Sequence, residues 1–76
     1  MKAYIFVETK AGQAQKVAQR IRKLTGVKQA DCCWGRPDVF VFVEVAGAKA
    51  LGNLVIARIS RVPGVQATET HIAIAP

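Results

Sequence analysis

The sequence predicts a ferredoxin-like α+β domain, a four-stranded antiparallel sheet with two helices on one face. Its 76 residues are enough for a single domain, residues 1–76. Two observations predict this fold. Apolar residues recur at strand spacing and helix spacing in the order βαββαβ. The second half of the chain also repeats the first, because residues 21–27 align with residues 59–65 at an offset of 38 residues.

The first half begins with a strand over residues 3–9, where side chains alternate between two faces. Residues 13–24 form a helix, because apolar residues recur three or four positions apart: Ala14, Val17, Ala18, Ile21 and Leu24. Gly26 fits the C-terminal cap of this helix. Residues 27–34 form a second strand, which is less apolar and is therefore expected at an edge of the sheet.

The second half begins with the most apolar stretch of the chain, residues 39–46, a strand suited to the centre of the sheet. Gly35 and Pro37 mark the turn that precedes it. Residues 48–62 form the second helix, with an inward set of Leu51, Leu54, Val55, Ile59 and Val62. Residues 65–75 form the last strand. Right-handed crossovers then place the first and third strands at the centre and the other two at the edges.

The two faces of the predicted sheet differ in side-chain size. Small and β-branched residues suit the face that the helices cover: Ala3, Ile5, Val7, Val39, Val41, Val43 and Val45. The open face then carries Tyr4, Phe6, Phe40, Phe42, Ile72 and Ile74. An apolar patch of this size is not normally left in water, whichever face the helices choose. We therefore expect two chains to pack sheet against sheet, as a dimeric α+β barrel.

Composition and charge narrow the setting of the protein. The formal net charge of +6 permits an acidic partner. Four of the basic residues, Lys16, Arg20, Arg22 and Lys23, fall on the first helix, a pattern more typical of a solvated face than of a nucleic-acid surface. No signal peptide or membrane-spanning run is present, so no membrane partner is expected. The adjacent Cys32 and Cys33 point to opposite faces of a strand, so they are not expected to form a disulfide with each other. We expect both to pack within the sheet as free thiols, which indicates a reducing, cytoplasmic setting.

The sequence shows no catalytic or metal-binding constellation. His71 shares a face with Glu69, an arrangement that is more often a surface pair than an acid–base couple. The cysteines do not form a Cys-x-x-Cys motif, and no glycine-rich phosphate loop precedes a helix. We therefore expect no catalytic residue, no metal site, no cofactor and no enzymatic activity.

Asp38 is the most informative polar residue, and two interpretations stay open. An Asp after a proline at the start of a strand can cap the turn through the backbone. Alternatively, its carboxylate binds the ammonium of a small zwitterion while the backbone amides of Gly35 and Arg36 bind the carboxylate. Thr68 and Thr70 either add hydroxyls to such a site or are ordinary β-branched edge residues.

Several short motifs share the order and spacing of a known family. They are Tyr4-Ile5-Phe6-Val7-Glu8-Thr9 followed by Gly12, Gly26-Val27, Gly35-Arg36-Pro37-Asp38, Pro63-Gly64-Val65, and Thr68-Glu69-Thr70. The third is similar to the G-x-x-D signature of that family. Over essentially its whole length, the chain resembles the C-terminal effector-binding (RAM) domain of the Lrp/AsnC transcriptional regulators.

The resemblance implies a homodimer that assembles further into an octamer or a decamer, with amino acids or related metabolites bound between dimers near the G-x-x-D turn. Carried over by position, the ligand-binding residues are Gly35, Arg36, Asp38, Thr68 and Thr70, and Asp38 holds the ligand ammonium. The family's regulators carry a helix-turn-helix domain ahead of this one, whereas this chain starts at the first strand. We therefore expect a stand-alone module that does not bind DNA directly and that acts either by co-assembly with full-length relatives or as a metabolite sensor.

Three other functions remain as alternatives. Phe40 and Phe42 on an open sheet suit a single-stranded RNA-binding module. A sheet cleft with a functional His71 suits a small enzyme of the dimeric α+β barrel type. A purely structural association domain is the last. We favour an amino-acid-sensing module over all three.

Overall fold

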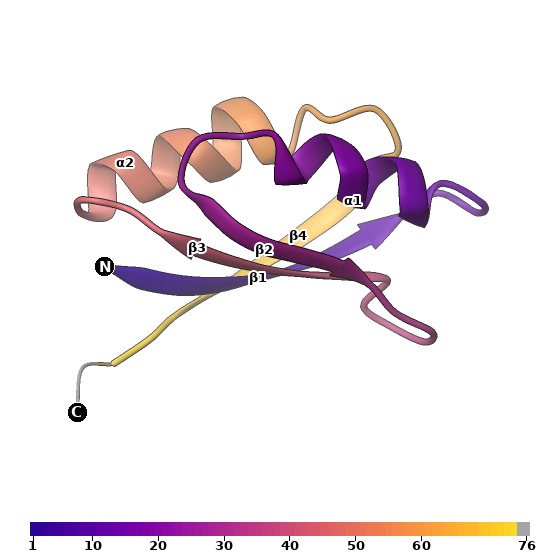
Figure 1. The fold of residues 1–76 in the computed structure, drawn as a ribbon, viewed down its shortest axis with the longest axis horizontal. Helices are drawn as coiled ribbons and strands as arrows, with labels where there is room; N and C mark the ends of the chain where they lie inside the picture. The colour runs from indigo at the N-terminus through magenta and orange to yellow at the C-terminus, as the bar shows by residue number, and fades with distance from the viewer. Residues whose placement is uncertain (75–76) are drawn as a thin grey trace.

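The structure is a computed structural model and describes residues 1–74 (Figure 1). Four strands and two helical stretches follow the predicted order. They are β1 (Lys2–Thr9), α1 (Ala14–Arg22), β2 (Val27–Cys32), β3 (Val39–Glu44), α2 (Ala48–Asn53), its continuation η1 (Leu54–Ile59), and β4 (Val65–Ile72). The strands form one antiparallel sheet in the order β2-β3-β1-β4. The prediction of a ferredoxin-like fold with the first and third strands at the centre is therefore confirmed.

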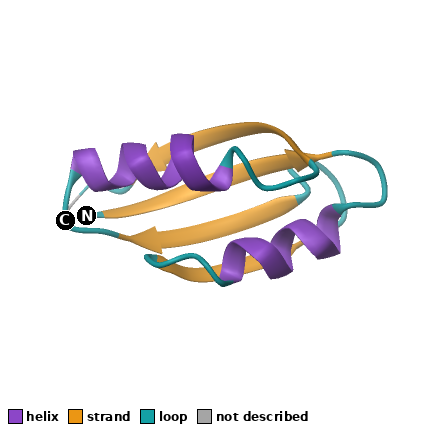
Figure 2. Cartoon of the chain, turned by 90° about the horizontal axis from the view of Figure 1, so that it is seen from above, coloured by secondary structure: helices purple, strands orange, loops and turns teal. Residues whose placement is uncertain are grey.

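The helices cover one face of the sheet and leave the other face open (Figure 1). Seen from above, the two helices lie over different parts of the sheet, with strands visible between them (Figure 2). The core between the layers contains the predicted small and β-branched residues, of which Ala3, Ile5, Val7, Val39 and Val43 are fully buried. These side chains alternate along β1 and β3, so the residues between them point to the open face.

The second helical stretch differs from a regular α-helix. Segment η1 is a π-helix, in which hydrogen bonds join residues five positions apart. The Ser60 amide, for example, donates to the Val55 carbonyl at 2.8 Å. This wider turn places Leu54 and Ile59, five positions apart, on the buried face, whereas Val55 is only partly buried. The predicted helix over residues 48–62 is thus present but ends at Ile59 and changes its winding midway.

The last strand corrects one predicted surface. Residues Val65 and Gln66 stand opposite the single residue Thr9, and this bulge reverses the direction of the side chains that follow. A strand that continued without the bulge from Val65 sends Ile72 to the open face. Instead Ile72 pairs with Ala3 and lies on the helix-covered side of the sheet, where it is half exposed. The prediction for Ile72 was therefore wrong.

The end of the chain falls partly outside the structure. Ile74 follows the end of β4 and is almost fully exposed, so no strand register assigns it to the open face. The predicted last strand ran to Ala75, which lies outside the described residues. Strand β2 ends at Cys32, and both Cys32 and Cys33 are exposed free thiols, so the expectation that they pack within the sheet was wrong. None of the helices in residues 1–74 has the length and apolarity that crossing a membrane requires.

Candidate functional site

Four aromatic residues form the centre of the open sheet face. Strand register pairs Tyr4 with Phe42 and Phe6 with Phe40, and the ring centroids of both pairs are 5.1 Å apart. These four residues are called the aromatic cluster below. Tyr4 and Phe40 are 49% and 41% exposed, so the part of the chain that the structure describes leaves about half of each side chain uncovered. The prediction that the aromatic side chains share the open face is confirmed for these four.

Strand β4 extends this face with polar side chains. The register places His71 beside Tyr4 and Glu69 beside Phe6. The His71 Nε2 atom lies 3.1 Å from Glu69 Oε2, and the imidazole stacks on Phe6 with ring centroids 4.6 Å apart. The Glu69 side chain is largely exposed and the His71 side chain is about half exposed, which fits the predicted surface pair.

The turn between β2 and β3 is fastened to the end of β1. Gly35 has a φ of +100°, a conformation that other residues adopt only with strain. The Asp38 amide donates to the Val7 carbonyl at 3.0 Å. In return, the Thr9 amide donates to Asp38 Oδ2 at 2.8 Å. The Asp38 carboxylate thus binds a backbone amide of β1, which links the turn to a neighbouring strand.

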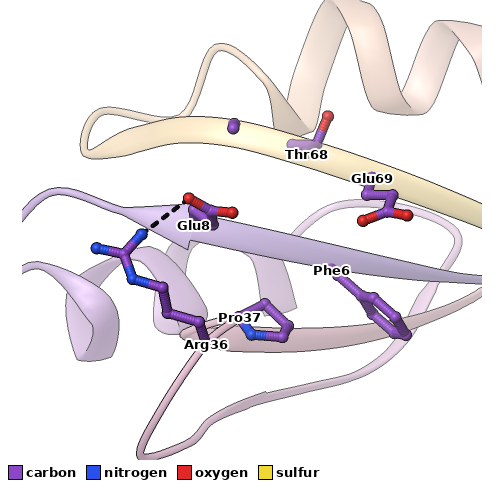
Figure 3. Close-up of a pocket in the computed structure, with 7 residues that line it drawn as sticks. Phe6, Glu8, Arg36, Pro37, Thr68 and Glu69 are labelled. Carbon is purple, nitrogen blue, oxygen red and sulfur yellow. Dashed lines mark hydrogen bonds and ion pairs between the residues drawn. The ribbon is translucent and has the colours of Figure 1, made fainter.

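A hollow of about 420 Å³ opens between this turn, β1 and β4 (Figure 3). Its lining is Phe6, Glu8, Arg36, Pro37, Ala67, Thr68 and Glu69. Phe6 and Pro37 give it an apolar wall, and Glu8 and Glu69 bring two carboxylates. The Arg36 guanidinium donates to Glu8 Oε1 at 3.0 Å, and both side chains stay accessible to solvent. A cation and two anions therefore meet beside an apolar surface, a combination that suits a small molecule carrying both charges.

The structure brings together only some of the predicted ligand residues. Arg36 and Thr68 line the hollow, whereas Gly35, Asp38 and Thr70 do not. Thr68 and Thr70 pair with Val7 and Ile5, so their side chains belong to the helix-covered side of the sheet. Accordingly, the Thr68 hydroxyl points away from Glu8 and Glu69 (Figure 3).

Sequence reasoning did not assign Glu8, Pro37, Ala67 and Glu69 to the site, and it assigned Phe6 to the dimer interface and not to ligand binding. The missing information was the register between β1 and β4, which sets Glu8 opposite Ala67 and Phe6 opposite Glu69. Glu69 lies within the Thr68-Glu69-Thr70 motif. The alternation of a strand means that one of its members must face opposite to the two threonines. That rule was the available signal.

The open face carries negative charge, which does not support the RNA alternative. Register places Glu8, Asp31, Glu44 and Glu69 on it, opposite Ala67, Phe40, Lys2 and Phe6 respectively. Four carboxylates on one face repel the negatively charged phosphate backbone of RNA. Among residues 1–74, no group of three or more His, Cys, Asp or Glu side chains is arranged to hold a metal ion.

Comparison with known proteins identifies the family. The family model described as the Lrp/AsnC ligand binding domain matches residues 2–76. A hypothetical protein from Pyrococcus horikoshii is 32% identical, covers 99% of this chain and 90% of its own, and superimposes with a TM-score of 0.89. The comparison with curated proteins finds no match.

Two regulators share the fold at lower identity. E. coli AsnC is 22% identical with a TM-score of 0.90, and the match covers 99% of this chain and 51% of AsnC. A transcriptional regulator from Neisseria meningitidis, solved in complex with L-Met, is 21% identical with a TM-score of 0.84, over 97% of this chain and 49% of its own. This chain thus spans about half the length of both regulators. From its family match over nearly every residue, the chain belongs to the Lrp/AsnC ligand-binding domain family.

Proposed function

We propose that this protein is a non-enzymatic effector-binding module whose ligand is an amino acid or a related small metabolite. The observation that carries the proposal is the family match, which extends over residues 2–76. The L-Met complex of the Neisseria meningitidis regulator supports an amino acid as the ligand class.

In this proposal the ligand lies in the hollow beside residues 35–38. The Arg36 guanidinium binds the ligand carboxylate, because a guanidinium fork matches a carboxylate in geometry and charge. Glu8 and Glu69 supply negative charge for the ligand ammonium, and Phe6 offers a surface for an apolar side chain. Asp38 fixes the turn through its hydrogen bond to the Thr9 amide. Its direct contact with the ammonium stays a prediction.

The proposal includes assembly. The hollow is partly open to solvent, and the aromatic cluster beside it stays partly exposed within residues 1–74. A second copy packed on the open face buries that cluster and adds a wall to the hollow. Further assembly into an octamer or a decamer, and co-assembly with longer relatives, are the proposed means by which binding acts on regulation.

A thermal-melt panel of the purified protein against the common amino acids tests this function. A ligand that binds only the folded state raises the free energy of unfolding, by about 2.7 kcal/mol when its concentration is a hundredfold above Kd. The melting temperature therefore rises. One amino acid or a few related ones should give such a shift. A flat response across amino acids and their simple metabolites contradicts the proposal.

Two substitutions assign the contacts once a ligand is found. Arg36→Gln should weaken binding while leaving the melting temperature of the free protein nearly unchanged, because its ion pair with Glu8 is exposed and such pairs contribute at most about 1 kcal/mol. Asp38→Asn keeps an oxygen that accepts from the Thr9 amide but removes the charge. Weaker binding by this variant assigns Asp38 to the ammonium, and unchanged binding assigns it to holding the turn only.

A further inference from the structure

The charges of this protein are separated between its two layers. The helix layer, defined as residues 13–26 and 47–64, carries seven of the eleven basic residues: Lys16, Arg20, Arg22, Lys23, Lys49, Arg58 and Arg61. It contains none of the five acidic residues. All seven basic side chains are in exposed residues.

The acidic residues lie in the other layer. Four of them are on the open sheet face, and Asp38 is in the turn beside it. The two ion pairs found in residues 1–74 both use carboxylates of that layer, Glu8 and Glu69. The cations of the helix layer therefore have no carboxylate partner in the part of the chain that the structure describes. Such a surface repels itself and attracts a polyanion.

Five of these cations form a basic patch: Lys16, Arg20, Lys23, Arg58 and Arg61. The first three recur four and three positions apart along α1 and its C-cap residue Lys23, on the side of the helix away from the buried Val17, Ala18 and Ile21.

The turn that follows η1 lies beside this stripe. Arg20 Nη1 donates to the Pro63 carbonyl at 3.2 Å, and a Cβ on Gly64 would lie 2.9 Å from Val17 Cγ2. The segment that carries Arg61 therefore runs beside α1, as Figure 1 shows. The patch thus takes its cations from α1 and its C-cap, from η1, and from the turn after η1.

We propose that the basic patch binds the phosphate backbone of duplex DNA, without regard to base sequence. Cations spread over two helices suit the regular phosphates of a duplex. The helix layer contains no Phe, Tyr or Trp, so it lacks the stacking platforms by which proteins hold single strands. The layer also stays exposed when a second copy covers the open sheet face.

This inference departs from the expectation that the chain does not contact DNA. That expectation concerned DNA binding by a helix-turn-helix domain. The proposal instead concerns DNA binding by the basic residues of the helix layer. It is also independent of the effector site, so the failure of either proposal leaves the other standing.

Fluorescence anisotropy with a labelled duplex of arbitrary sequence tests the proposal. The protein should bind at about 50 mM salt and lose affinity steeply towards 200 mM. A triple variant, Lys16→Gln with Lys23→Gln and Arg61→Gln, should bind at least about tenfold more weakly. A plot of the logarithm of its binding constant against the logarithm of salt concentration should have a slope that is shallower by about 0.9 for each phosphate that the variant no longer neutralises. Arg20 is left in place because its hydrogen bond to Pro63 supports the fold.

A charge-matched control separates the patch from net charge. Lys2→Gln with Lys10→Gln and Lys28→Gln removes three cations that lie outside the helix layer. This control should bind less than about threefold more weakly under the same conditions. Equal weakening in the two triple variants, absence of binding at about 50 mM salt, or tighter binding to a single strand of the same length would each overturn the proposal.

Discussion

Asp38 illustrates how one residue links the turn before β3 to β1. It precedes β3, its amide donates to Val7 of β1, and its Oδ2 accepts from the Thr9 amide at 2.8 Å. Replacing it by alanine leaves a partly buried amide without a charged acceptor. Hydrogen bonds to charged groups contribute about 1.5–3 kcal/mol, so Asp38→Ala should lower the free energy of unfolding by that amount. Urea denaturation followed by circular dichroism measures the change.

Asp31 provides the matched control at the residue scale. Among residues 1–74, the one hydrogen bond to its Oδ2 comes from the exposed Gln29 side chain, at 2.7 Å, and none comes from the backbone. Asp31→Ala should therefore change stability by no more than about 0.5 kcal/mol. Equal destabilisation in the two alanine variants would mean that the Thr9 contact adds nothing to stability.

At the scale of elements, the position of α1 depends on its close contact with Gly64, in the connection before β4. Gly64 has a φ of +99°, and a Cβ there would come within 2.9 Å of Val17 Cγ2 and 3.1 Å of Gln13 Cβ. Gly64→Ala should therefore force α1 away from the connection and cost about 2–5 kcal/mol, the sum of backbone strain and overpacking. Thermal or urea unfolding measures it.

Gly12 separates the two causes. Its φ of +75° is also left-handed, but a Cβ there meets nothing within 4 Å. Gly12→Ala should cost only the backbone strain of about 1–2 kcal/mol. If Gly12→Ala destabilises the protein as much as Gly64→Ala, then the contact with α1 is not what requires glycine at residue 64.

The elements also show what the sequence alone could and could not predict. Small and aromatic residues alternate along β1 and β3, and one face of each strand is buried. This alternation was therefore sufficient to predict which side chains of β1 and β3 face the helices and which face the open side. Strand β4 is an edge strand with polar residues on both faces, so its pattern did not reveal the bulge at Val65 and Gln66. That one-residue shift moved Ile72 off the open face and brought Glu69 onto it.

The site was predicted in part for the same reason. The 35–38 turn stood out through its glycine, proline and aspartate, and Arg36 does line the hollow. The other charged residues of the hollow, Glu8 and Glu69, come from β1 and β4, far apart in sequence, and only strand pairing brings them to the same hollow as Arg36. The role of Asp38 in fastening β1 likewise depends on a contact between residues 29 positions apart.

For the whole molecule, the open sheet face predicts association. Aromatic side chains each bury about 150–250 Å², so leaving the aromatic cluster in water forgoes a stabilisation comparable with that of a domain this small. Phe42→Lys places a charge at the centre of that face. It should give a monomer that folds poorly, measured by light scattering after size-exclusion chromatography.

Ile56 supplies the control for this prediction. It is a large apolar residue that is 72% exposed on the helix layer, outside the proposed interface. Ile56→Lys should keep the mass of the wild-type assembly. A stable, native dimer of the Phe42→Lys variant would show that the open face is not the surface through which copies associate.

A calorimetric titration of the amino acid that most raises the melting temperature tests the central claim most directly. It compares the wild type with Arg36→Gln and with Lys49→Gln, a change of equal charge on the helix layer, away from the hollow. We predict saturable binding to the wild type and to Lys49→Gln, with affinity reduced at least tenfold, about 1.4 kcal/mol, in Arg36→Gln. Equal affinity in all three proteins would contradict a site beside the 35–38 turn, and absence of binding heat in the wild type would contradict the effector-binding function itself.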